Sequence, residues 1–144
     1  MLAVNNLCIE RNGRAIIQDL SFTLEGQKRL FVQGEIGSGK TTLLLALLGF
    51  VPVTKGEIQL FGQVCREEKD FAPFRGTIGI CFQNSDDQLF GPTVLDDIAF
   101  GPLNQNVPRE QAYHIAEQQL ERLGITRLKD RMVHTLSGGE KNFT

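Results

Sequence analysis

A glycine-rich segment early in the chain has the residue types and spacing of a phosphate-binding loop. It reads Gly34-Glu35-Ile36-Gly37-Ser38-Gly39-Lys40-Thr41. This spacing matches the pattern G-x-x-x-x-G-K-[ST], in which glycines let successive backbone N–H groups turn toward one anion. A helix that begins at the end of such a loop adds its unpaired N–H groups and its dipole. The segment therefore predicts a loop that binds a chain of phosphates.

Two side chains at the end of this loop supply the remaining chemistry. We expect Lys40 to contact the β- and γ-phosphates as a flexible point charge. We expect the Thr41 hydroxyl to bind Mg²⁺, an ion that prefers oxygen ligands. Thr42 follows and completes the predicted nucleotide-binding set. The plainer alternative is a tight connection without function, and the apolar segment before the loop and the helical segment after it argue against that.

Two further segments carry candidate chemistry. Leu136 to Glu140 reads Leu-Ser-Gly-Gly-Glu, which alone predicts only a flexible bend. Behind a phosphate-binding loop it predicts a second anion site, made by Ser137 and the backbone N–H groups of Gly138 and Gly139. Gln83 follows a predicted strand over residues 77–82. A lone glutamine at a strand end is normally a surface residue, but its place between the two anion motifs favours a functional role.

Taken in order, these motifs resemble those of the ATP-binding-cassette (ABC) ATPases. The segment from Leu136 resembles the ABC signature, usually written LSGGQ, with Glu140 in the glutamine place. In that family the signature opens a helix and faces the γ-phosphate bound by a partner subunit. Gln83 resembles the Q-loop glutamine, which in the family senses Mg²⁺ and the attacking water and couples to the membrane subunit. Residues 82–90 and 99–102 closely resemble the ATPase subunits of cobalt, nickel and vitamin importers, the energy-coupling-factor type.

The resemblance implies an α/β fold: a P-loop NTPase, ABC-type nucleotide-binding domain with a helical subdomain. Residues 1–85 would form its strand-rich ATP-binding core and residues 86–144 the helical subdomain. It implies ATP and Mg²⁺ as cofactors, with Thr41 and Gln83 on the metal. It also implies a translocase whose ATP hydrolysis drives import. Its partners would be transmembrane importer subunits and a second ABC ATPase subunit in a head-to-tail dimer, at the cytoplasmic face of the cell membrane as a peripheral protein.

The chain also departs from the family pattern. In the family an apolar strand ending in Asp-Glu, the Walker B motif, follows the signature, and a switch histidine follows that. The sequence given has neither, so we expect an incomplete, truncated domain that is unstable and inactive alone. Val94-Leu95-Asp96-Asp97 is no substitute, because Gly91 and Pro92 precede it and its acids suit the first turn of a helix. Where the family places an adenine-stacking aromatic, this chain has Arg11 and Asn12.

The elements that must position these residues follow from local patterns. Asn12-Gly13 predicts a hairpin turn between two strands. Further strands are expected at residues 29–32, 58–61 and 77–82. Helices are expected at residues 40–48, closed by Gly49, from 94 onward, where Thr93 and Asp96 have the spacing of a capping box, and between Pro108 and Gly124. The last helix is expected to bury one apolar face, made by Ala112, Ile115, Ala116, Leu120 and Leu123.

Composition limits the class of protein. The 144 residues contain 41% hydrophobic and 22% charged residues, which is ordinary for a globular domain. The formal net charge of −2 offers no basic surface for nucleic acid, so none is expected as a partner. We interpret Asp86 and Asp87 as surface or contact residues and not as catalysts. Two alternatives stay open at this point: a non-catalytic remnant that at most binds nucleotide, and a soluble ABC ATPase without a transport role.

Overall fold

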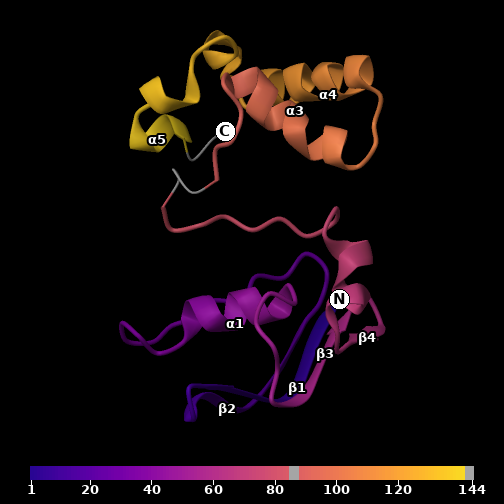
Figure 1. The fold of residues 1–144 in the computed structure, drawn as a ribbon, viewed down its shortest axis with the longest axis vertical. Coiled ribbons are helices and arrows are strands. Elements are labelled where there is room, and N and C mark those ends of the chain that lie inside the picture. Colours follow the sequence, from indigo (N-terminus) through magenta and orange to yellow (C-terminus); the bar gives the residue numbers. More distant parts are fainter. Residues whose placement is uncertain (85–87, 142–144) are drawn as a thin grey trace. The chain divides into compact units, whose positions relative to one another are not determined.

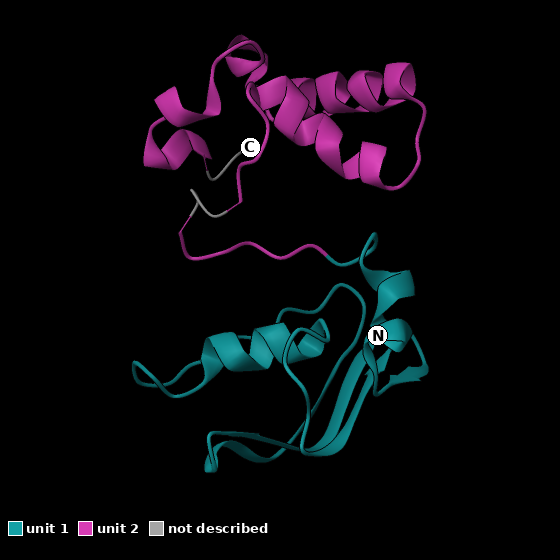
Figure 2. Ribbon diagram, viewed as in Figure 1, with its two compact units in different colours: residues 1–78 teal, residues 79–144 magenta. Residues whose placement is uncertain are grey.

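The computed structural model describes residues 1–84 and 88–141. The chain divides into two compact units, Met1–Ile78 and Gly79–Thr144 (Figure 2). The division that we expected at residues 85 and 86 stays a prediction, because residues 85–87 lie outside the described ranges.

Unit 1 is built on a four-stranded antiparallel sheet with the order β2-β1-β3-β4 (Figure 1). The strands are β1 (Leu2–Arg11), β2 (Arg14–Leu24), β3 (Lys55–Leu60) and β4 (Gln63–Cys65). The predicted hairpin joins β1 to β2, where Arg11 pairs with Arg14. Asn12 and Gly13 both have positive φ, 52° and 72°, as a two-residue type I′ turn requires.

A second turn of the same kind was not predicted. Phe61 and Gly62 have φ of 51° and 90° and connect β3 to β4, with Leu60 paired to Gln63. The predicted strand over residues 58–61 included Phe61, which instead lies in the turn with a left-handed φ that is unusual for a bulky residue. After β4 the chain forms the short helices α2 (Glu68–Phe71) and η1 (Ala72–Phe74).

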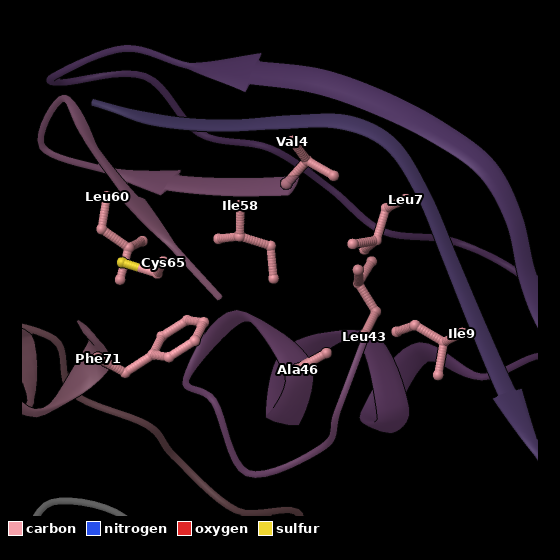
Figure 3. Packing of buried hydrophobic residues seen from close by; sticks show 9 residues of the cluster. All are labelled: Val4, Leu7, Ile9, Leu43, Ala46, Ile58, Leu60, Cys65 and Phe71. Carbon is pink, nitrogen blue, oxygen red and sulfur yellow. The ribbon is translucent and has the colours of Figure 1, made fainter. Parts of the chain in front are cut away.

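Helix α1 (Lys40–Leu47) packs on the sheet and closes the core of unit 1. It ends as expected at Gly49, whose φ is 78°. The Phe50 N–H donates to the Leu45 carbonyl at 2.9 Å and the Gly49 N–H to the Ala46 carbonyl at 3.0 Å, which is a Schellman motif. Figure 3 shows side chains of the sheet, α1 and α2 meeting in one cluster: Val4, Leu7, Ile9, Leu43, Ala46, Ile58, Leu60, Cys65 and Phe71.

Two predicted strands are wrong. Residues 29–32 and 77–82 form no strand in the described part of the chain, although both are apolar. Leu30, Phe31 and Val32 are exposed, and Phe31 keeps 79% of its surface accessible. A strand requires a neighbour for its N–H and C=O groups. The described strands pair only among themselves and offer these two segments no partner. An apolar run alone was therefore not enough to form a strand.

Unit 2 is helical within its described residues. It contains α3 (Val94–Asn104), α4 (Arg109–Arg122), η3 (Thr126–Leu128), η4 (Val133–Thr135) and α5 (Gly138–Lys141). Thr93 caps α3 as predicted, because its hydroxyl oxygen accepts from the Asp96 N–H at 3.2 Å. Asp96 and Asp97 lie in the first turn of this helix, the place expected for them. Among the described residues, no helix combines the length and hydrophobicity that crossing a membrane requires.

The apolar face predicted for the helix after Pro108 is partly right. Ala112, Ala116 and Leu120 are fully buried, whereas Leu123 is 51% exposed. Leu123 is the C-cap of α4, and the chain turns away at Gly124, whose φ is 68°. Ile125 takes the buried place instead, in a cluster that contains Val94, Leu120, Ile125, Leu128 and Leu136.

Candidate functional site

The predicted phosphate-binding loop lies between β2 and α1 in unit 1, and all of its residues are exposed or half-buried. Gly37 and Gly39 adopt left-handed φ of 82° and 91°, which non-glycine residues seldom reach. The Ser38 N–H donates to the Glu35 carbonyl at 3.2 Å and closes a turn. A Cβ atom on Gly34 would lie 2.6 Å from the Ser38 Oγ. The loop is therefore tight, and two of its glycines are required by backbone conformation.

Lys40 lies across this loop. Its Nζ donates to the carbonyl oxygen of Gly34 at 2.9 Å and to that of Glu35 at 2.7 Å, and it lies 3.4 Å from the Ser38 Oγ. The ammonium group thus lies beside the backbone of the predicted phosphate-binding loop. The predicted loop residues, Gly34 to Thr42, are brought together in one place by a single turn and the start of one helix.

The start of α1 suits an anion. Its N-cap, Gly39, has no side-chain cap, and its first turn contains no acidic residue, so the helix-terminal N–H groups have no negative side chain of their own helix beside them. Thr41, the second residue of the helix, is exposed and offers a hydroxyl oxygen of the kind that Mg²⁺ prefers. By donor chemistry, this cradle fits a phosphate chain with its magnesium ion.

Gln83 and the Ser-Gly-Gly motif belong to unit 2. Gln83 is exposed and lies in a bend, and the neighbouring Phe82 N–H donates to the Gln88 Oε1 at 3.0 Å. Residues 77–82, directly before Gln83, form no strand in the part of the chain that the structure describes, contrary to expectation. Asp86 and Asp87, interpreted above as surface or contact residues, lie outside the described residues.

The second anion motif forms the start of α5, as the resemblance implied. Ser137 and Glu140 make a reciprocal cap: the Glu140 N–H donates to the Ser137 Oγ at 3.3 Å, and the Ser137 N–H donates to the Glu140 Oε2 at 2.9 Å. The Ser137 hydroxyl also donates to the same carboxylate oxygen at 2.9 Å. Leu136 is buried and anchors the motif in the core of unit 2.

Two arginines complete this arrangement. Arg131 places its Nη1 3.1 Å from the Glu140 Oε1, and Arg127 places its Nη1 3.7 Å from the same oxygen. Arg131 also donates from Nη2 to the Thr135 carbonyl at 2.7 Å. The Ser137 N–H, the Ser137 hydroxyl and then the arginines hold the pKa of Glu140 below its ordinary value. From the sequence, Glu140 was interpreted only as a replacement for glutamine, although the Ser-x-x-Glu spacing is the signal of such a cap.

Unit 1 has a glycine-rich loop of the phosphate-binding type that leads into α1. Unit 2 has a capped Ser-Gly-Gly turn. Together these features define the P-loop nucleotide-binding class of domain. Residues 17–143 match the family described as ABC transporter. The chain belongs to the ABC transporter family, and the fold predicted from the resemblance is confirmed.

Relatives support the same assignment. The chain is 97% identical to an ABC transporter ATP-binding protein of Haemophilus influenzae, over 100% of this chain and 66% of that protein. It is 36% identical to the energy-coupling factor transporter ATP-binding protein EcfA1 of Fusobacterium nucleatum, over 98% of this chain and 53% of that protein. The structure of cbiO1 from Clostridium perfringens, part of the ABC transporter complex cbiONQ, matches with a TM-score of 0.87 and 29% identity. That match covers 99% of this chain and 57% of cbiO1. The chain thus spans about two thirds or less of the relatives named here.

Proposed function

We propose that this chain is the ATP-binding, energy-coupling part of an ABC import system, in which ATP hydrolysis drives transport. The observation that carries the proposal is the position of Lys40, whose ammonium group contacts the backbone of the loop at Gly34 and Glu35. Because the same loop supplies left-handed glycines and the uncapped start of α1, cation and N–H donors gather where a phosphate chain would bind.

In this proposal each part of the site has one task. Gly34 to Gly39 hold the phosphates through backbone N–H groups, and Lys40 offsets their charge. Thr41 and Gln83 would hold Mg²⁺, whose chemistry is to neutralise charge on the β- and γ-phosphates. Ser137, Gly138 and Gly139 would face the nucleotide bound by a second ATPase subunit. That assignment rests on the family resemblance.

One relative is named as an energy-coupling factor transporter ATP-binding protein, and cbiO1 is described as part of an ABC transporter complex, which supports a transport role. The direction of transport, import, rests on the resemblance of residues 82–90 and 99–102 to the ATPase subunits of cobalt, nickel and vitamin importers. We therefore propose transmembrane importer subunits and a second ABC ATPase subunit as partners, with the protein at the cytoplasmic face of the cell membrane. Co-fractionation with membranes tests this location. Recovery of the protein only in the soluble fraction, with its partners present in the cells, would favour the non-transport alternative.

The binding test uses a fluorescent ATP analogue with the wild-type chain and with Lys40→Ala. We expect Lys40→Ala to bind about tenfold to hundredfold more weakly, because losing a charge-assisted contact costs about 1.5–3 kcal/mol. The matched control is Lys28→Ala, which removes the same charge from an exposed position outside the loop. Equal affinity of wild type and Lys40→Ala would exclude the loop as the nucleotide site.

Turnover is tested separately. ATP hydrolysis that belongs to this protein must disappear in Lys40→Ala and persist in Lys28→Ala. If nucleotide binding depends on Lys40 but no Lys40-dependent hydrolysis is found, the alternative in which the chain only binds nucleotide would be favoured.

A further inference from the structure

Ser137 has two hydrogen-bond donors, and both are directed to one carboxylate oxygen. The Ser137 N–H and the Ser137 hydroxyl each donate to the Glu140 Oε2 at 2.9 Å. A hydroxyl has one proton, so a proton given to Glu140 is not available to another acceptor at the same time. Hydrogen bonds to a carboxylate are about twice as strong as those to a neutral oxygen.

The opposite oxygen of the same carboxylate contacts the arginines. Arg131 contacts the Glu140 Oε1 at 3.1 Å and is itself fixed by the Thr135 carbonyl at 2.7 Å. Arg127 reaches the same oxygen at 3.7 Å from a side chain that is 70% exposed. The Glu140 side chain is 23% exposed, so the carboxylate is partly enclosed by its partners.

We propose that Glu140 competes with a nucleotide phosphate for the hydroxyl proton of Ser137, and that Arg131 is the positioning residue that weakens this competition. The inference rests on the proposed function, because it requires Ser137 to meet a phosphate. It assigns a regulatory contact to the residue that replaces the usual glutamine of the signature.

The direction of the Arg131 effect follows from the geometry. The Ser137 N–H holds one carboxylate oxygen against the motif, and Arg131 acts on the other oxygen. What Arg131 adds is positive charge on the other carboxylate oxygen. That charge makes the carboxylate a weaker proton acceptor and reduces its repulsion of an approaching phosphate. Removing Arg131 should therefore strengthen the hold of Glu140 on Ser137.

The test uses full-length protein and the ATP analogue AMP-PNP with Mg²⁺. One measurement is the affinity of the loop for a fluorescent nucleotide at low protein concentration. The other is the analogue concentration that gives half-maximal self-association in sedimentation. We expect Glu140→Gln to lower that concentration about fivefold, since a charge-assisted bond becomes a neutral one, without changing loop affinity. The glutamine oxygen can still accept from the Ser137 N–H, so the helix cap is kept.

Arginine variants test the positioning role. Arg131→Gln should raise the analogue concentration that gives half-maximal self-association. Arg131→Lys should keep this concentration close to the wild-type value, and Arg127→Gln should raise it less because the contact of Arg127 is longer. A merely structural role for Arg131 predicts equal shifts in the wild-type and Glu140→Gln backgrounds. Our inference predicts a much smaller shift when Glu140 is already glutamine.

The outcomes separate this inference from the proposed function. If Glu140→Gln associates no more readily than wild type, or if its gain persists in Ser137→Ala, the inference is overturned while nucleotide binding stands. Nucleotide binding without self-association in every variant overturns it as well. If wild type binds no nucleotide in the first measurement, the proposed function fails, and this inference fails with it.

Discussion

Gly39, the N-cap of helix α1, lies against Ile16 of strand β2: a Cβ atom on Gly39 would stand 2.6 Å from the Ile16 Cγ2. The backbone of Gly39 is also left-handed, with φ of 91°. Strand β2 therefore packs against the end of the predicted phosphate-binding loop. The absence of a side chain at Gly39 allows the loop and the strand to approach each other.

Gly39→Ala is expected to disturb the loop in two ways. The left-handed conformation costs a non-glycine residue about 1–2 kcal/mol. The new methyl group would in addition displace Ile16 or the loop. We expect nucleotide affinity, measured by titration with a fluorescent ATP analogue, to fall about tenfold or more. Gly26→Ala is the matched control, since a Cβ there meets nothing within 4 Å and its φ is not left-handed. Equal losses in the two variants would contradict this account.

Leu120 and Leu123 form a matched pair at the end of α4. Leu120 is fully buried and Leu123 is 51% exposed. Leu120→Ala should lower the free energy of unfolding by about 2–5 kcal/mol, because it removes buried methyl groups and leaves a cavity. Leu123→Ala should change it by less than about 0.5 kcal/mol. Urea denaturation measures both, and a large loss for Leu123→Ala would mean that the end of α4 is covered in solution.

The Asp96 carboxylate links the start of α3 to α4. The Thr93 hydroxyl and then the Tyr113 hydroxyl, which donates to the Asp96 Oδ1 at 2.7 Å, lower the pKa of Asp96 below its ordinary 3.8. A lowered folded pKa contributes stability above pH 3.8 that is lost as the pH falls through the folded value. Tyr113→Phe should therefore reduce stability at neutral pH and have a smaller effect in acid. Unfolding measured from pH 7 to pH 2 checks this, with Asp96→Asn as the background in which the dependence should vanish.

Phe31 is expected to limit the solubility of the isolated chain. It is 79% exposed in a segment that forms no strand. An exposed apolar segment without a partner favours aggregation. Phe31→Ser should slow aggregation, followed by light scattering, and change the free energy of unfolding by less than about 0.5 kcal/mol.

Phe71→Ser is the control for that experiment, because Phe71 is 4% exposed in the core of unit 1. Loss of a buried phenylalanine side chain costs about 3–5 kcal/mol, so this variant should unfold readily. If Phe31→Ser destabilises the chain as much as Phe71→Ser, the segment is buried in solution, and our interpretation of it is wrong.

Local patterns predicted local structure well. The Asn12-Gly13 turn, the end of α1 at Gly49 and the cap of α3 at Thr93 were all foreseen and are present. Each depends on residues a few positions apart, so a short stretch of sequence contains all the groups involved. The predicted phosphate-binding loop is of this kind, and its Gly37 and Gly39 take left-handed conformations. The binding roles of Gly34 to Thr42, Gln83 and Ser137 to Gly139 stay predictions.

The sequence by itself determined the turn at Asn12-Gly13, where the main helices begin, and which segment has the pattern of a phosphate-binding loop. Only the tertiary structure decided that residues 29–32 form no strand, that Ile16 supports Gly39, and that Arg131 and Arg127 reach Glu140. The physical reason is distance along the chain. A strand needs a neighbour, and a long charged side chain needs a partner, and neither can be identified until the chain has folded back on itself.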